Sequence, residues 1–264
     1  MTNIIEVQNL KKSFRAFEAV KGVSFSVAQG QTFGFLGPNG AGKSTTIKML
    51  TTLLRPTSGT MLVDGADPVK DPHAVRRAFG IVFQDTSLDD DLTAWENMDL
   101  HGALYGVPRA SRHARIGKLL EFVDLADRRD SFVREYSGGM KRRLEIARGL
   151  LHRPKIIFLD EPTLGLDPQT RNHMWDYLRE LKEQEKITVF FTTHYMEEAD
   201  RNADAIAIID HGSIIASGTG RGLRRQTGKD TLEEAFLELT GRDIRKEGPS
   251  GIERLRMMRR ARGG

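Results

Sequence analysis

The sequence predicts an α/β fold: a mainly parallel sheet with an antiparallel β part at the N-terminus and an inserted α-helical subdomain. Short apolar runs rich in β-branched residues alternate with segments of helical spacing along the chain. This alternation is typical of a parallel sheet with helices on its faces. Between residues 88 and 150 the apolar residues recur at helical spacing without a convincing strand pattern. We therefore expect this stretch to form the inserted helices.

The expected elements follow the chain in order. A helix over residues 43–53 should follow the third strand, and a final amphipathic helix over 232–239 should end at Gly241, a residue that favours helix termination. Short runs of Val, Ile, Leu, Phe and Thr indicate the strands. The expected strands cover residues 4–7, 20–27, 32–36, 61–63, 80–83, 155–159, 188–192, 205–209 and 213–216.

The composition is that of a globular protein. The 264 residues suffice for one large domain with a sizeable core, and 39% hydrophobic with 29% charged residues argues against intrinsic disorder. The apolar runs are much shorter than the roughly 20 residues that a membrane-spanning helix needs, so we expect no span. The chain has no cysteine, which excludes disulfides, thiolate metal sites and thiol catalysis and is consistent with a reducing compartment.

The positive charge is concentrated at the C-terminus. Residues 251–264 contain five arginines and one glutamate, an excess equal to the net charge of +4 of the whole chain. The rest of the chain is therefore balanced, which argues against a nucleic-acid-binding surface. We expect residues 1–240 to form the folded domain and 241–264 a basic tail. The tail is either a solvated, disordered end or an electrostatic contact with anionic lipid or a membrane partner.

A glycine-rich segment between strand 32–36 and the following helix matches the phosphate-binding pattern G-x4-G-K-[ST]. Glycines let successive backbone N–H groups surround phosphate oxygens, and the helix N-terminus adds its positive dipole end. Lys43 supplies a charge to the terminal phosphates, and Ser44 offers a hydroxyl to Mg²⁺. An ordinary glycine-rich turn is the alternative, but the strand–loop–helix context favours a P-loop NTPase core. The expected nucleotide contacts are Gly37, Pro38, Asn39, Gly40, Ala41, Gly42, Lys43, Ser44 and Thr45.

An apolar strand that ends in two carboxylates, a Walker B pattern, follows about 115 residues later. The C-terminal ends of buried parallel strands line the ligand crevice of an open α/β sheet. Asp160 is expected to hold Mg²⁺ directly or through water, and Glu161 to orient or deprotonate the attacking water. Alone, this pattern describes an ordinary strand end; downstream of a P-loop it predicts nucleotide hydrolysis.

A serine and two glycines mark a second candidate anion-binding helix start. Ser137 is a natural N-cap, and Gly138 and Gly139 expose backbone N–H groups before an apolar helical run. The same pattern also describes an ordinary capped helix. The residues alone leave open which phosphate this helix start would meet.

From about Ile5 to Gly218 the motifs resemble, in order and spacing, the nucleotide-binding domain of ABC transporters. The resemblance implies that the ligand is ATP with Mg²⁺, and that Ser137 to Gly139 close over the ATP held by a second subunit. The catalytic residues implied are Lys43, Glu161 and His194, the last of these contacting the γ-phosphate.

Further roles follow from the same resemblance. Gln84 would join Ser44 and Asp160 at Mg²⁺ and would face the transmembrane partner. Phe14 would stack on adenine. Asp167 would lie in the loop that follows the Walker B strand and would belong to the nucleotide site.

Several segments are similar to bacterial drug-resistance exporters of the daunorubicin type. They are Tyr136 to Met140 with the basic residues after it, residues 83–97, and residues 231–241. Tyr136, Met140 and Phe14 differ from the commoner family wording, but none of these differences removes an acid, a base or a phosphate ligand. The resemblance implies an ATP-binding subunit that powers export of a drug, antibiotic or lipid-like molecule. It would act as a homodimer on a separate permease, at the cytoplasmic face of the cell membrane.

Three alternatives stay open. A non-transport ABC ATPase of translation or DNA repair is disfavoured by the single cassette and the lack of long heptads and cysteine. A catalytically silent binding module is disfavoured by the complete set of Lys43, Asp160, Glu161 and His194. Import instead of export is the third alternative. A neighbouring permease gene without a gene for a solute-binding protein would indicate export.

Overall fold

The protein is described by a computed structural model that covers residues 2–15 and 17–241. The expectation for the basic tail, residues 241–264, therefore lies outside the described residues except for Gly241. The domain limits, 1–240 with the helical subdomain at about 88–150, stay predictions.

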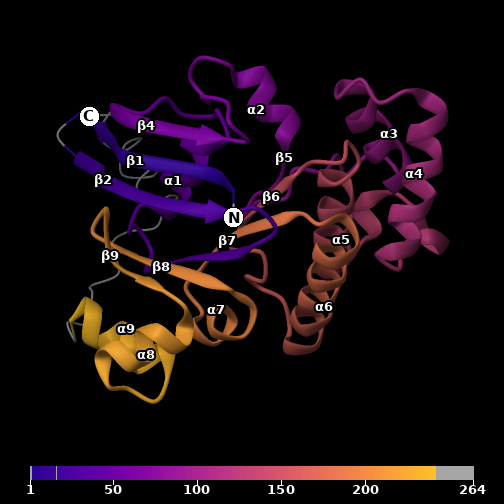
Figure 1. The fold of residues 1–264 in the computed structure, drawn as a ribbon. Coiled ribbons are helices and arrows are strands. Elements are labelled where there is room, and N and C mark those ends of the chain that lie inside the picture. The colour runs from indigo at the N-terminus through magenta and orange to yellow at the C-terminus, as the bar shows by residue number, and fades with distance from the viewer. Residues whose placement is uncertain (1, 16, 242–264) are drawn as a thin grey trace, which may run out of the picture.

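Two sheets form the β part of the molecule (Figure 1). An antiparallel sheet of order β2-β1-β4 consists of β1 (Asn3–Phe14), β2 (Phe17–Ala28) and β4 (Ser58–Val63). The second sheet has the order β5-β6-β7-β3-β8-β9; its neighbours pair in parallel except for β8 and β9. This arrangement confirms the predicted mainly parallel sheet with an N-terminal antiparallel part. The second sheet consists of β3 (Thr32–Leu36), β5 (Phe79–Val82), β6 (Ile156–Asp160), β7 (Thr188–Thr193), β8 (Ala205–Asp210) and β9 (Ser213–Gly218).

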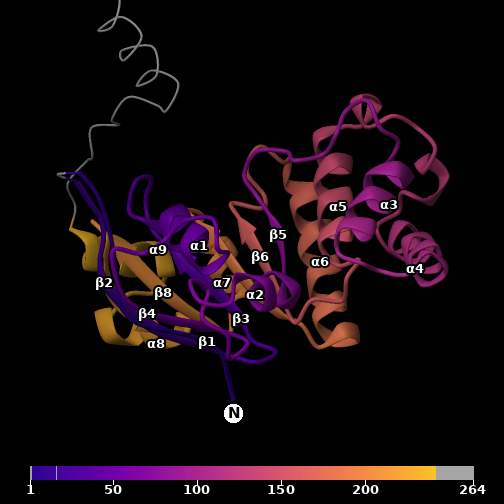
Figure 2. The same cartoon turned by 90° about the horizontal axis from the view of Figure 1, so that it is seen from above.

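The predicted inserted helices are present between β5 and β6. Residues 83–155, all of them described, contain three α-helices, two 3₁₀ turns and no strand. Figure 2 shows these helices together on one side of the molecule, next to α6 (Pro168–Glu185). The inserted elements are α3 (Ala94–Leu104), α4 (Arg109–Phe122), the turns Ala126–Arg128 and Val133–Glu135, and α5 (Gly138–Gly149).

The remaining helices flank the sheets. α1 (Lys43–Leu50) and α9 (Leu232–Thr240) correspond to predicted helices. The helix expected over 43–53 is three residues too long, because Thr52 has a φ of 65°, a left-handed conformation that a right-handed helix cannot continue. The helices not predicted from the sequence are α2 (Pro72–Ala78), α6 and α8 (Gly220–Thr227). The segment α7 (Met196–Asn202) carries Glu197, Glu198 and Asp200, whose spacing is that of a helix.

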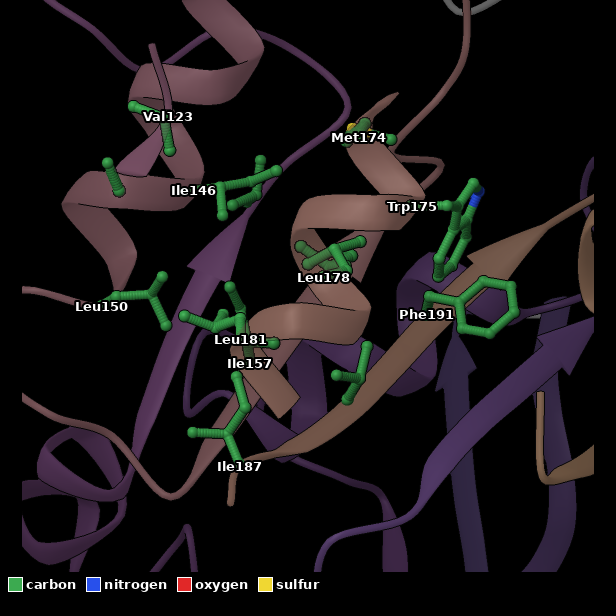
Figure 3. Packing of buried hydrophobic residues seen from close by; sticks show 14 of the residues in the cluster. Val123, Ile146, Leu150, Ile157, Met174, Trp175, Leu178, Leu181, Ile187 and Phe191 are labelled. Atoms are coloured by element: carbon green, nitrogen blue, oxygen red, sulfur yellow. The ribbon is translucent and has the colours of Figure 1, made fainter. Parts of the chain in front are cut away.

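The central strands are packed on both faces. Alternate residues of β6 belong to two different hydrophobic clusters: Ile157 packs toward α5 and α6, whereas Phe158 packs toward the antiparallel sheet. Figure 3 shows Leu178 and Leu181 of α6 in the first cluster, with Ile157 beside them. Because both faces are covered, the carboxyl ends of the central strands are held in fixed positions relative to one another.

Candidate active site

Three neighbouring strands end at one edge of the parallel sheet. β6, β7 and β3 lie side by side, with Asp160 in register with Thr192 and Leu36 in register with Thr193. The predicted phosphate-binding loop, residues 37–45, follows Leu36, and His194 follows Thr193. Strand order therefore brings together three motifs that are far apart in the sequence.

The phosphate-binding loop has the conformation that its glycines permit. Gly40 and Gly42 have φ values of 79° and 109°, which residues with a side chain rarely adopt. At Gly37 an added Cβ would lie 2.3 Å from the carbonyl oxygen of Ile209. The loop leads directly into α1, whose first N–H groups have no partner within the helix and point at the loop. These features suit a loop that surrounds an anion.

The three predicted catalytic residues meet at one carboxylate. Lys43 Nζ lies 3.1 Å from Glu161 Oε1, and His194 Nδ1 lies 2.5 Å from Glu161 Oε2. Lys43 Nζ also donates to the carbonyl oxygen of Gly37 at 2.6 Å. Lys43 and Glu161 are 5% and 7% exposed, so this ion pair is shielded from bulk solvent and screened little by salt.

The oxygen ligands expected for Mg²⁺ lie beside this group. Ser44 Oγ donates to Asp160 Oδ1 at 3.2 Å, and Asp160 is buried. In the described part of the chain no three His, Cys, Asp or Glu side chains cluster into a metal site. Mg²⁺ commonly uses one or two carboxylates and completes its shell with water and phosphate oxygens, so Ser44 and Asp160 fit this ion.

Thr192 contacts both acidic residues, although sequence reasoning did not identify it. Its hydroxyl donates to Asp160 Oδ1 at 2.6 Å and accepts from the backbone N–H of Glu161 at 2.9 Å. Glu161 itself has a φ of 51°, in the left-handed region. The signal in the sequence was its position near the end of the strand predicted over 188–192, but its partner is evident only once the strand register is known.

Arg142 connects α5 to the end of β6. It was not identified as a site residue from the sequence. Its guanidinium donates to the carbonyl oxygens of Pro162 at 2.8 Å, Asp160 at 3.2 Å and Phe83, and it pairs with Glu145 at 3.2 Å. Burial lowers the pKa of Arg142 from its usual value, and the carboxylate of Glu145 opposes this shift. These contacts connect α5, which Ser137 caps, to the segment that carries Glu161.

The helix start predicted to bind a second anion lies away from residues 37–45. Ser137 caps α5 and accepts the N–H of Met140 at 3.3 Å. Figures 1 and 2 both show α5 well separated from α1. Within residues 2–15 and 17–241 no hydrogen bond joins Ser137, Gly138 or Gly139 to residues 37–45.

The other predicted site residues occupy three separate places. Gln84 is exposed in the loop after β5. Phe14 ends β1 with its side chain 46% exposed, and the ammonium of Lys12 lies 5.0 Å from the centre of its ring. Asp167 caps α6 and accepts the N–H of Thr170 at 3.0 Å; hydrogen bonds from the hydroxyl and N–H of Thr170 lower the pKa of Asp167. None of these contacts tests the proposed nucleotide roles.

Comparisons with known proteins identify the family of the chain. Residues 20–164 match the ABC transporter family. The daunorubicin/doxorubicin resistance ATP-binding protein of Streptomyces peucetius is 46% identical over 231 residues, which are 88% of this chain and 70% of the relative. The Nod factor export ATP-binding protein I of Ralstonia nicotianae is 43% identical over 233 residues, which are 88% of this chain and 72% of that protein.

Solved structures give the same result. An ATP-binding subunit of an ABC transporter superposes with a TM-score of 0.82 at 33% identity, over 90% of this chain and all of the other. An ATP-binding cassette solved as a dimer in a post-hydrolysis state, with ADP and phosphate bound, superposes with a TM-score of 0.73 at 28% identity, over 81% and 98% of the two chains.

The chain belongs to the ABC transporter family, as one of its ATP-hydrolysing cassettes. In the described part of this cassette, none of the helices combines the length and apolar character needed to cross a bilayer.

Proposed function

We propose that this cassette hydrolyses Mg·ATP to power export of a small molecule through a separate membrane permease, at the cytoplasmic face of the membrane. The observation that carries the proposal is the meeting of Lys43, Glu161 and His194 beside Ser44 and Asp160 at the ends of three parallel strands. Export is supported by relatives named for drug resistance and for Nod factor export.

Each of these residues has a distinct role in hydrolysis. The loop N–H groups and Lys43 bind the phosphates, and Ser44 and Asp160 hold Mg²⁺, which when bound neutralises charge on the phosphate oxygens. Glu161 orients or deprotonates the attacking water. His194 Nδ1, at 2.5 Å from Glu161 Oε2, fixes one carboxylate oxygen of Glu161, while Lys43 at 3.1 Å holds the other.

Two copies supply the complete site. Ser137 to Gly139 are separated from residues 37–45 within one chain, as the positions of α5 and α1 indicate (Figures 1 and 2). A helix start with exposed N–H groups binds anions, so these residues suit the phosphates of an ATP held by a second copy. The similar cassette solved as a dimer with ADP and phosphate bound supports the pairing of two copies.

Shared sites are tested by mixing two inactive variants. Lys43→Ala removes the phosphate contact, and Gly138→Asp places a negative charge at the second anion site without a clash, because an added Cβ there has no neighbour within 4 Å. Each variant alone should lack ATPase activity. A mixed dimer contains one intact shared site, so the mixture should regain activity. A mixture as inactive as its components would contradict sites shared between copies.

Export is tested in cells that carry this gene together with its neighbouring permease gene. Wild type and Glu161→Gln are compared for susceptibility to doxorubicin and daunorubicin, which the relatives' names suggest as probes. Higher resistance and lower drug accumulation with the wild type would support export of this class of compound. Equal accumulation would contradict drug export, and higher accumulation with the wild type would indicate import.

A further inference from the structure

One buried hydroxyl joins the metal-binding and the catalytic residue of the site. Thr192 lies on β7 directly opposite Asp160 of β6, and it is fully buried. Its Oγ1 donates to Asp160 Oδ1 at 2.6 Å and accepts the N–H of Glu161 at 2.9 Å. A threonine hydroxyl has one proton and two lone pairs, so this pair of bonds uses it as donor and as acceptor at once.

The bond to Asp160 fixes the orientation of its carboxylate. Oδ1 receives two hydroxyl donors, Thr192 at 2.6 Å and Ser44 at 3.2 Å. Because both donors reach the same oxygen, they fix the direction in which the carboxylate faces. Ser44 is itself a proposed magnesium ligand, so when Ser44 turns toward the ion, Thr192 remains to hold the carboxylate in place.

The bond to Glu161 secures a strained backbone. Glu161 has a φ of 51°, a left-handed conformation that a side chain-bearing residue adopts only when its surroundings enforce it. The peptide unit before Glu161 is held at both ends: the Thr192 hydroxyl accepts the N–H of Glu161, and Arg142 donates to the carbonyl oxygen of Asp160. After Glu161, Arg142 also donates to the carbonyl oxygen of Pro162. This turn directs the carboxylate of Glu161 toward Lys43 and His194.

We propose that Thr192 is a positioning residue for ATP hydrolysis, which sets the carboxylate of Asp160 and the backbone of Glu161 through a single hydroxyl. The proposal rests on the roles proposed above for Asp160 and Glu161. It goes beyond them because Thr192 belongs to none of the sequence motifs that define the site.

Removal of the hydroxyl tests the proposal. Thr192→Val keeps the shape of the side chain but loses both hydrogen bonds, and should lower kcat about 10- to 100-fold, the usual effect of losing an outer-shell partner. The KM for ATP should change little, because Thr192 does not contact the phosphate-binding loop through its hydroxyl. The Mg²⁺ concentration for half-maximal rate should rise.

Two further variants separate positioning from a structural effect. Thr192→Ser retains the hydroxyl and should recover most of kcat. Thr188→Val, on the same strand, loses a hydroxyl that accepts from Gly30 N at 2.9 Å, and should keep wild-type kcat and Mg²⁺ dependence. Affinity for a fluorescent ATP analogue reports whether each variant retains a folded nucleotide site.

The outcomes are distinct. A Thr192→Val protein with wild-type kcat and Mg²⁺ dependence, measured beside an inactive Glu161→Gln protein, would overturn the role of Thr192 alone. Equal loss in Thr192→Ser and Thr192→Val would also overturn it, because the hydroxyl would then not be the cause. Full activity in Glu161→Gln would overturn the proposed function together with this inference.

Discussion

Replacement of Arg142 by methionine should lower the free energy of unfolding by about 3–5 kcal/mol. The guanidinium lies between α5, the end of β6 and the loop after β5, where it donates to the carbonyl oxygens of Phe83, Asp160 and Pro162. It also pairs with Glu145, which is 1% exposed. No other ion pair among residues 2–15 and 17–241 has a partner so deeply buried.

The magnitude follows mainly from the carboxylate that is left behind. A hydrogen bond from a charged donor contributes about 1.5–3 kcal/mol, and methionine keeps some of the apolar contacts of the arginine stem. Glu145 would retain the N–H of Ser87 at 2.8 Å but lose its positive partner. A buried charge without its partner is the costly element, so Arg142→Met with Glu145→Met should cost less than the sum of the single changes.

Equilibrium unfolding in urea measures these differences as shifts of the transition midpoint. Lys141→Met is a matched control, because Lys141 pairs with Asp90, whose side chain is 58% exposed, and should cost less than about 1 kcal/mol. An Arg142→Met protein within about 1 kcal/mol of wild type, or strictly additive costs in the double variant, would refute the reasoning.

Two further predictions concern pH and the phosphate-binding loop. Burial, with smaller effects of Arg148 and His152, lowers the pKa of His101 from 6.5 to about 3. The unfolded chain therefore binds a proton between these values that the folded chain does not, and stability falls as pH falls; His101 alone should cost about 2 kcal/mol between pH 7 and pH 5. In urea unfolding, the free energy of unfolding of His101→Gln should depend less on pH than that of the wild type. An unchanged pH dependence would contradict the lowered pKa of His101. Gly42→Ala should weaken ATP binding in nucleotide titrations more than Gly40→Ala, because at Gly42 the added Cβ would lie 2.7 Å from the carbonyl oxygen of Ala19, whereas at Gly40 it has no neighbour within 4 Å. Equal ATP affinities of Gly42→Ala and Gly40→Ala would contradict this prediction.

The sequence predicts those parts of the site that depend on local patterns. The strand–loop–helix unit around Lys43 and the strand that ends at Asp160 each contain their chemistry within about ten residues, and the structure joins them as the parallel sheet requires. The inserted helices were predicted from their apolar spacing in the same way.

The residues that were missed act through contacts between distant segments. Thr192 meets Asp160 because β6 and β7 pair in one particular register, which no pattern within either strand specifies. In the sequence, Arg142 is the middle one of three consecutive basic residues, 141–143. It is the only one of the three that is buried, because it faces the end of β6. The length of α1 was missed for a local reason, since Thr52 adopts a left-handed conformation that a threonine rarely adopts.

ATP-dependent dimerisation of Glu161→Gln protein tests the central claim most directly. The variant should bind Mg·ATP without hydrolysing it, and ATP shared between two copies stabilises the dimer through linkage. Size-exclusion chromatography with light scattering should therefore show a dimer with Mg·ATP and a monomer without it, while Lys43→Ala stays monomeric in both. A Glu161→Gln monomer at saturating Mg·ATP, with binding confirmed by a fluorescent analogue, would contradict a site shared between two copies of this chain.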